Sequence, residues 1–194
     1  MIDFEQIKRK VYRNILEQLP SYLTYHNLAH TEYVMDKAIF LARIEDVSEK
    51  ELFLLRLAAL FHDTGFIENP KNHEEIGCGI ARNYLSEDLS ESDLSKICGM
   101  IMATKIPQSP TNQLERIIAD ADLEYLGTSE FEKQGNALFE ELKHFNPSFS
   151  EQAWNELQLT FLEKHHYHTD YCKKFREPKK QDNIDSVKEK LNLV

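Results

Sequence analysis

An apolar run that ends in a histidine and an aspartate constrains this chain more than any other feature. Residues 52–60 hold a single charged side chain, that of Arg56, and this composition predicts a helix inside the core. His62 and Asp63 follow directly, and Gly65 stands where the end of a helix often needs a left-handed residue. We therefore expect His62 and Asp63 to leave the core at a helix end, where an imidazole and a carboxylate can share a divalent cation. An isolated pair of this kind would more simply be a polar helix cap.

The rest of the chain also has a helical pattern. It contains only six glycines and six prolines in 194 residues, and its apolar residues recur at helical rather than alternating spacing, so we predict an all-α fold. Ser48 and Glu51 match a capping box, and Thr111 is expected to cap the helix that runs to Asp122. The expected helices cover residues 1–19, 28–44, 48–62, 72 or 73 to 84, 90–104, 111–122, 128–143, 150–164 and 184–191.

Charge and cysteine content limit the class of protein. The formal net charge of −10 argues against a surface that coats nucleic acid, but a small phosphorylated substrate fits if a bound cation supplies local positive charge. Cys78, Cys98 and Cys172 are odd in number and unpatterned, so neither a disulfide framework nor a zinc ribbon is expected. No segment resembles a signal peptide, and no apolar run approaches the roughly 18 residues of a membrane span. We expect a soluble cytoplasmic protein without a membrane partner.

Further ligand-type residues occur at other predicted helix ends and faces. His26 and His30 lie upstream of the His-Asp pair, and Asp120 and Asp122 lie downstream of it. A lone histidine on an apolar helix is more often a satisfied core residue than a ligand. The presence of the other groups makes metal binding the better interpretation for His30, because imidazole and carboxylate together form a common ligand set.

The order His30, His62-Asp63, Asp122 resembles the signature of the HD-domain superfamily of metal-dependent phosphohydrolases. The matching motifs span residues 25–127, and residues 61–65 (Phe-His-Asp-Thr-Gly) are the most diagnostic part. The resemblance implies an HD-type helical domain over residues 1–164, followed by a C-terminal arm and short helix over residues 165–194. It also implies one divalent ion, Mn²⁺, Mg²⁺, Fe²⁺, Co²⁺ or Zn²⁺, which the sequence does not choose among. The implied ligands are His30, His62, Asp63 and Asp122, with Asp120 as the alternate.

His26 is the candidate general acid. Residues 25–30 (Tyr-His-Asn-Leu-Ala-His) are similar to the opening motif of the cyclic-nucleotide phosphodiesterase branch, which implies that His26 protonates the leaving oxygen. The alternative is a partly buried loop histidine. His26 shares a helix face with His30 if that helix begins at Thr24, and lies just outside the helix if Asn27 is its cap.

His73, Lys71 and Lys105 are candidate contacts for the substrate phosphate. Related branches place a histidine after the His-Asp pair, for a second metal or for the phosphate, whereas His73 could also be an ordinary first-turn residue. The lysines are more often solvated. Branches with two ions need an imidazole on the helix near residues 99–105, where this chain offers Thr104 and Lys105. We therefore expect a mononuclear site.

The histidines of residues 165–168 could be interpreted as a second metal site, but packing of a C-terminal arm is the safer interpretation. Consecutive residues of an extended segment point to opposite sides, and Glu163 and Asp170 are not at a recognised ligand spacing. The basic run from Lys173 to Lys180 is expected to be a solvated surface.

The resemblance implies a phosphohydrolase that cleaves a phosphomonoester or phosphodiester of a small molecule, with a nucleotide as the favoured class. Asp63 would steer the attacking water or take its proton, with Glu68 and Glu74 as alternative bases. The alternative function is a non-catalytic HD-type module that binds a nucleotide or a partner. An HD-type oxygenase with two irons would need more histidine ligands than the core supplies. Oligomeric state is not predicted.

Overall fold

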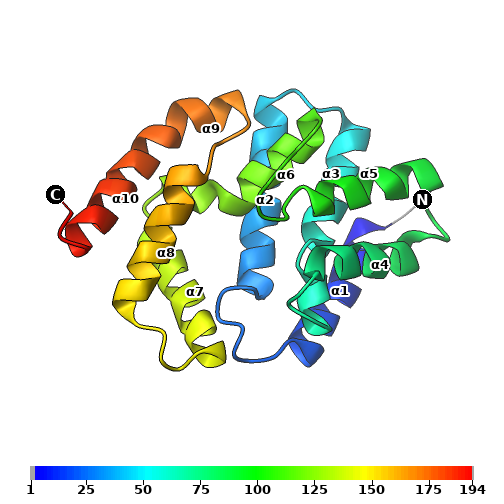
Figure 1. Cartoon of the computed structure of the whole chain (residues 1–194). Coiled ribbons are helices and arrows are strands. Elements are labelled where there is room, and N and C mark those ends of the chain that lie inside the picture. The colour runs from blue at the N-terminus through cyan, green and yellow to red at the C-terminus, as the bar shows by residue number, and fades with distance from the viewer. Residues whose placement is uncertain (1–2, 194) are drawn as a thin grey trace. The chain divides into compact units, whose positions relative to one another are not determined.

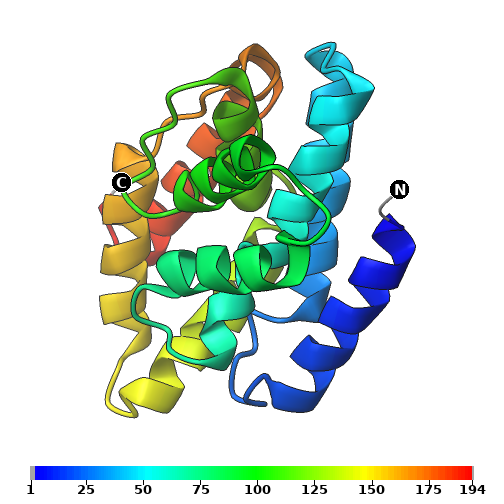
Figure 2. The same cartoon turned by 90° about the vertical axis from the view of Figure 1, so that its right-hand side faces the viewer.

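The chain is all-α, which confirms the predicted fold class. The computed structural model describes residues 3–193, without the side chain of Leu16. Within these residues there are ten α-helices, two short 3-10 helices and no strand (Figures 1 and 2). No helix in this range is long and apolar enough to cross a membrane. The cytoplasmic location stays a prediction.

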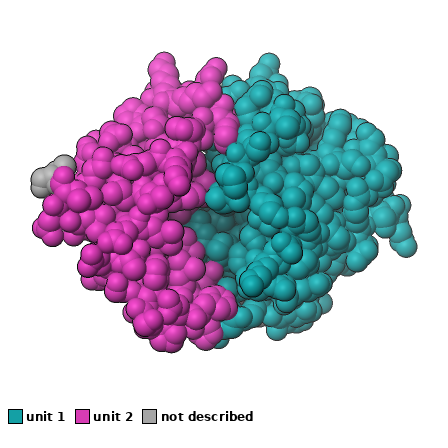
Figure 3. Space-filling model, viewed as in Figure 1, with its two compact units in different colours: residues 1–122 teal, residues 123–194 magenta. Residues whose placement is uncertain are grey.

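Two compact units divide the chain, residues 1–122 and residues 123–194 (Figure 3). A compact unit need not coincide with a family domain, so the expected division into residues 1–164 and 165–194 stays a prediction. The first unit contains α1 (Phe4–Gln18), α2 (Leu28–Ile44), α3 (Glu49–Phe61), η1 (Thr64–Ile67), α4 (His73–Leu85), α5 (Glu91–Met102) and α6 (Gln113–Leu123), whose last residue belongs to the second unit.

Helix α3 is the core of the first unit. It packs against α1, α2, α4 and α5 and can be followed in cyan in Figure 2. Leu55, Leu57, Leu60 and Phe61 are fully buried, as the apolar run predicts. The capping box of Ser48 and Glu51 is present at its N-terminus. The helix ends at Phe61, and His62 and Asp63 follow at its end as predicted, but His62 is fully buried and does not leave the core.

Gly65 has a different role from the predicted one. No glycine among the described residues has a positive φ, so the expectation of a left-handed residue at this position is wrong. A Cβ atom at Gly65 would lie 2.0 Å from the carbonyl oxygen of His73. The glycine is needed because the backbone of η1 approaches the start of α4 closely. This approach brings His73 beside Asp63.

Helix starts decide where several candidate residues lie. Asn27 caps α2 by accepting hydrogen bonds from the N–H groups of Ala29 and His30, so His26 lies outside the helix. The expectation that Thr111 caps α6 is wrong: Asn112 accepts from the N–H of Glu115, and Thr111 donates to the Glu115 carboxylate. Helix α1 starts at Phe4, and residues 1–2 of the expected helix lie outside the described residues.

The second unit contains η2 (Glu124–Gly127), α7 (Phe131–Phe145), α8 (Glu151–Lys164), α9 (Asp170–Phe175) and α10 (Glu177–Lys190). Helix α10 packs against α8, α9 and η2. It begins seven residues before the expected start at Ile184, and α9 was not expected at all. The buried residues along α10 include Lys180 and Asn183, so the sequence of its inward face lacks an apolar pattern.

The expected solvated lysine run is wrong at Lys180. This side chain is 2% exposed; its ammonium donates to the carbonyl oxygen of His165 at 2.6 Å and pairs with Glu177 at 2.9 Å. His165 and Tyr167 are buried and His166 is exposed, which confirms that this segment packs as an arm with alternating sides.

Candidate metal centre

Side chains from separate elements of the first unit meet at one buried point. His30 lies on α2, His62 follows α3, and Asp122 lies on α6. Nε2 of His30 is 3.0 Å from Oδ1 of Asp122 and 3.4 Å from Nε2 of His62. Oδ1 of Asp122 is 3.7 Å from Nε2 of His62. The three ligand atoms lie within 4.8 Å of one another, so these residues form a cluster able to hold a metal ion.

Asp63 turns one carboxylate oxygen toward the same point. Oδ2 of Asp63 is 3.1 Å from Nε2 of His62 and 3.3 Å from Nε2 of His30. This oxygen is buried, yet it accepts no hydrogen bond of acceptable geometry from a described residue. Buried polar atoms are normally paired. An unpaired carboxylate oxygen facing two imidazoles therefore fits a ligand position.

The backbone of α3 sets the orientation of His62. Nδ1 of His62 lies 2.9 Å from the carbonyl oxygen of Ala59, and because a carbonyl can only accept, Nδ1 carries the proton. In the neutral ring Nε2 then holds a lone pair, and it faces the carboxylates of Asp63 and Asp122. A lone pair among carboxylate oxygens needs a positive charge between them, either a proton or a cation. Fixing one ring nitrogen on a carbonyl so that the other is free is usual for metal-binding histidines.

The spacing of these atoms suits one cation. Nitrogen and oxygen ligands of divalent transition ions lie about 2.0–2.2 Å from the metal, so two ligands at right angles are about 3 Å apart. The separations around His30 Nε2 are 3.0 Å to Asp122, 3.3 Å to Asp63 and 3.4 Å to His62. The donor set therefore fits the ion that the family resemblance implies.

The electrostatics of the cluster also favour a positive charge. Burial alone would lower the pKa of His62, but the charges of Asp63 and Asp122 reverse this and raise it. Burial would raise the pKa of Asp63, but the charge of His62 outweighs burial and lowers this pKa. The carboxyl therefore stays ionised. The pKa of Asp122 shifts in the same direction. Burial would raise it, but contact with His30 and His62 lowers it to about 2. The cluster keeps two buried carboxylates ionised beside imidazoles.

Phe66 of η1 contacts two further imidazoles next to this cluster. The His26 ring stacks on Phe66 at a centroid distance of 4.0 Å, and the His73 ring lies 4.1 Å from Phe66. The His26 and His30 rings are 6.0 Å apart. His26 is thus held beside the cluster although it lies outside α2.

His73 presents one nitrogen to the acids around it. Nδ1 of His73 lies 3.0 Å from the carbonyl oxygen of Pro70, which leaves Nε2 free in the neutral ring. Nε2 is 3.7 Å from Oδ1 of Asp63 and 3.4 Å from Oε1 of Glu74, and Glu74 is buried. Asp63 therefore lies between the cluster, on its Oδ2 side, and His73, on its Oδ1 side.

The other candidate residues are not members of this cluster. Lys105 forms an ion pair with Glu75 of α4. Lys71 and Glu68 are exposed, and neither forms an ion pair with a described residue. Asp120 is fully buried but does not belong to the cluster, to which Asp122 contributes the carboxylate.

Three contributors to the site were not predicted from the sequence. The carbonyl oxygens of Ala59 and Pro70 fix the two imidazoles of His62 and His73, and backbone acceptors leave no sequence signal. Phe66 reads as an ordinary apolar residue after a glycine. Its position between two histidines that are 47 residues apart in the chain becomes visible only in the fold.

An all-α fold with two histidines and an aspartate gathered at the end of a buried helix defines a helical protein with a metal-site-like cluster. The chain belongs to the HD domain family, whose model matches residues 27–124, about half of the chain, including all four proposed ligands. A crystal structure of a predicted HD superfamily hydrolase from an uncultured Thermotogales bacterium has the same fold. The two are similar over 98% of each chain, with a TM-score of 0.62 and 20% sequence identity. No curated protein sequence matches the chain.

Proposed function

We propose that this protein is a metal-dependent phosphohydrolase that cleaves a phosphomonoester or phosphodiester of a small molecule, with a nucleotide as the favoured substrate class. The observation that carries the proposal is the convergence of the His30, His62 and Asp122 ligand atoms beside an unpaired oxygen of Asp63. Membership of the HD domain family supports it, because phosphohydrolysis is the chemistry that the resemblance implies.

His30, His62, Asp63 and Asp122 are the proposed ligands of one divalent ion. When bound, such an ion lowers the pKa of a water molecule and neutralises charge on a phosphate oxygen. Oδ2 of Asp63 contacts the His30 and His62 nitrogens, whereas Oδ1 is the oxygen 3.7 Å from Nε2 of His73. This oxygen is therefore placed to orient the attacking water or to take its proton.

His26 is the proposed general acid. Its stacking on Phe66 holds the ring 6.0 Å from that of His30, beside the ligands but outside the ligand cluster. An imidazole titrates near neutral pH, so it can give a proton to the departing oxygen under physiological conditions.

His73 is the proposed contact for the substrate phosphate, with Lys71 and Lys105 as weaker candidates. Lys105 would have to leave Glu75 to reach a phosphate, whereas exposed Lys71 has no ion pair to break. A single ion remains the proposed stoichiometry. The hydroxyl of Thr104, at the position where a further ligand would be wanted, donates to the carbonyl oxygen of Ile101 and is buried.

A phosphate-release assay tests the proposal. Metal-stripped protein is supplied in turn with Mn²⁺, Mg²⁺, Co²⁺, Fe²⁺ or Zn²⁺ and offered nucleoside mono-, di- and triphosphates, cyclic nucleotides and sugar phosphates. Hydrolysis should require added metal and should disappear in Asp122→Asn. The matched control is Asp88→Asn, which changes an exposed carboxylate of the same unit. Metal-dependent nucleotide binding without turnover of any substrate would favour the alternative, a non-catalytic HD-type binding module.

A further inference from the structure

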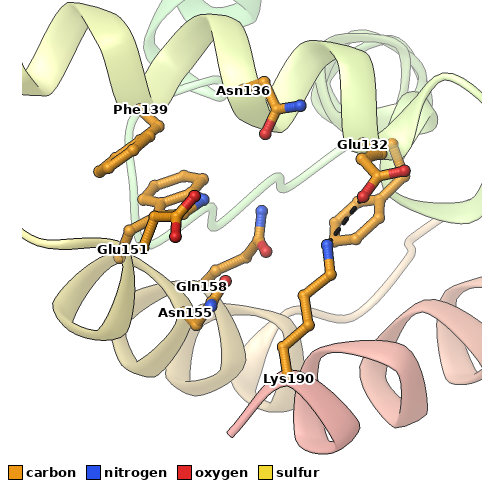
Figure 4. A pocket seen from close by; sticks show the side chains of 9 residues that line it. Glu132, Asn136, Phe139, Glu151, Asn155, Gln158 and Lys190 are labelled. Carbon is orange, nitrogen blue, oxygen red and sulfur yellow. Dashed lines mark hydrogen bonds and ion pairs between the residues drawn. The ribbon is translucent and has the colours of Figure 1, made fainter.

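Residues 123–194 contain a pocket of about 470 Å³ that has no residue in common with the proposed metal centre. It lies among α7, α8 and α10 (Figure 4). Small-molecule sites typically enclose about 300–1,000 Å³, so the pocket can take a ligand of metabolite size. Its lining combines aromatic rings, side-chain amides and a few charges, and each group restricts the kind of ligand that fits.

The apolar part of the lining is aromatic. Phe139 of α7 and Trp154 of α8 stack at a centroid distance of 5.8 Å with an angle of 24° between the ring planes. Phe131, about two helix turns before Phe139, also lines the pocket. These three side chains are 7–8% exposed, so the rings are held in place while an edge or face remains open to the pocket. Fixed aromatic rings favour a flat partner that can stack on them.

Side-chain amides supply the polar part. Asn136, Asn155 and Gln158 line the pocket, and their side-chain amides form no hydrogen bond with any residue that the structure describes. Asn136 and Gln158 point toward one another across the pocket in Figure 4. Each amide offers two donors and one acceptor, a combination that matches the edge of a nucleobase.

A glycine in the middle of α7 makes room for one of these amides. A Cβ atom at Gly135 would lie 2.8 Å from Nε2 of Gln158 and 3.7 Å from Cζ2 of Trp154. Glycine inside a helix is destabilising relative to alanine by roughly 0.5–1 kcal/mol, so its presence here needs a local reason. The space it leaves lets the Gln158 amide lie against the backbone of α7.

The charges of the lining disfavour an anionic ligand. Lys190 of α10 pairs with Glu132 of α7 at 2.8 Å. Glu151 also lines the pocket and forms no ion pair within residues 3–193. The two carboxylates and one ammonium leave a net negative charge, which repels a phosphate group. The pocket therefore differs from the proposed metal centre, where a cation would attract one.

We propose that the pocket among α7, α8 and α10 binds an uncharged nucleobase or nucleoside, which stacks on the aromatic rings and is read by the unpaired amides. Stacking together with amide hydrogen bonds is the usual way in which proteins hold a free base. A plain sugar would use the amides but would lack a flat face for the rings. The proposal goes beyond the proposed hydrolysis and does not depend on it.

The chain carries its own probe for this site, because Trp154 is its single tryptophan. Adenosine is titrated into the full chain while tryptophan fluorescence is recorded, with AMP and glucose as comparison ligands. We expect a saturable change with adenosine, and binding of AMP weaker by roughly tenfold or more because of its added negative charge. Asp122→Asn protein should give the same adenosine curve, which keeps a failure at the metal centre separate from a failure here.

Two variants test the lining. Gln158→Ala removes one amide, and Gly135→Ala displaces the same amide by adding a Cβ atom while improving the helix propensity of α7. Both should weaken adenosine binding roughly five- to tenfold, the loss of one hydrogen bond. Gln152→Ala, which changes an exposed glutamine of α8 outside the pocket, should bind as the unchanged protein does.

Any of three results would overturn the proposal. One is the absence of a saturable change with any nucleobase or nucleoside at millimolar concentration. Another is saturable binding of glucose but not adenosine, which would assign the pocket to another class of ligand. Unchanged affinity in Gln158→Ala and in Gly135→Ala would place adenosine elsewhere and would equally refute the assignment.

Discussion

Asp63→Asn is the sharpest test of the metal centre, because it keeps the shape of the side chain and removes its charge. Oδ2 of Asp63 lies 3.1 Å from Nε2 of His62. These two atoms would share one ion at about 2.1 Å each, and with an effective dielectric constant of about 20 the attraction between a carboxylate and a divalent ion at that distance is on the order of 16 kcal/mol. The burial of Asp63 cancels part of it, and breaking a buried charge pair typically costs about 3–5 kcal/mol. Metal affinity should therefore fall by roughly 10²- to 10⁴-fold.

The assay is a competition between the protein and a chelator of known affinity for Mn²⁺, with metal content checked by elemental analysis. Circular dichroism should show unchanged helicity in Asp63→Asn, because the exchange leaves α3 and its packing intact. Glu68→Gln is the matched control, since Glu68 is an exposed carboxylate in the same connection and should leave metal binding unchanged. If Asp63→Asn holds Mn²⁺ as tightly as the unchanged protein, the ligand assignment and the electrostatic reasoning behind it are both wrong.

Four further predictions follow from particular residues. His26→Ala should slow hydrolysis on the order of 10²–10⁴-fold while metal content stays the same, and an unchanged rate with a poor leaving group would dismiss His26 as the acid. Protein loaded with excess Mn²⁺ should hold one ion per chain by elemental analysis; two tightly held ions, reduced to one by His73→Ala, would make His73 a ligand. Gly65→Ala should lower the free energy of unfolding by roughly 3 kcal/mol in a denaturant titration, because its Cβ atom would overlap the His73 carbonyl. Interaction with the neighbouring Cys78 side chain lowers the pKa of the Cys98 thiol to about 6, so its alkylation by iodoacetamide should be fast at neutral pH and fall below about pH 6; a profile centred near pH 9 would refute this.

Sequence patterns located helices well where apolar residues mark one face or where a cap has a side chain of its own. The bounds of α2 match the expected range, Ser48 caps α3 as predicted, and the expected helix over residues 150–164 matches α8 with Ser150 as its cap. The first seven residues of α10 were not predicted because polar residues occupy the inward face there. Lys180 finds the His165 carbonyl, and Asn183 donates to the carbonyl of Leu126 at 2.8 Å. These partners exist only in the folded unit, so hydrophobic periodicity could not reveal the first two turns of the helix.

The candidate metal centre was accessible from the sequence in its chemistry but not in its geometry. The imidazole and carboxylate groups of His30, His62 and Asp122 stand in recognisable contexts, and the structure brings them together. The sequence could not show that Gly65 serves a close backbone approach rather than a left-handed turn, because both need the same residue. Nor could it distinguish Asp120 from Asp122 without the family resemblance, since both lie near the end of one helix.

The close contact at Gly65 has a consequence for how tolerance to mutation is distributed in this molecule. Every other amino acid carries a Cβ atom, so all nineteen replacements meet the same obstacle at the His73 carbonyl. A saturation scan for activity would therefore report position 65 as no more replaceable than the ligands themselves, although glycine has no side chain with which to bind or react. Scans that measure only activity would count it as a chemical residue. Measuring abundance alongside activity would separate the two kinds of loss, because replacements at Gly65 should deplete the folded protein, whereas Asp63→Asn should leave it abundant and inactive.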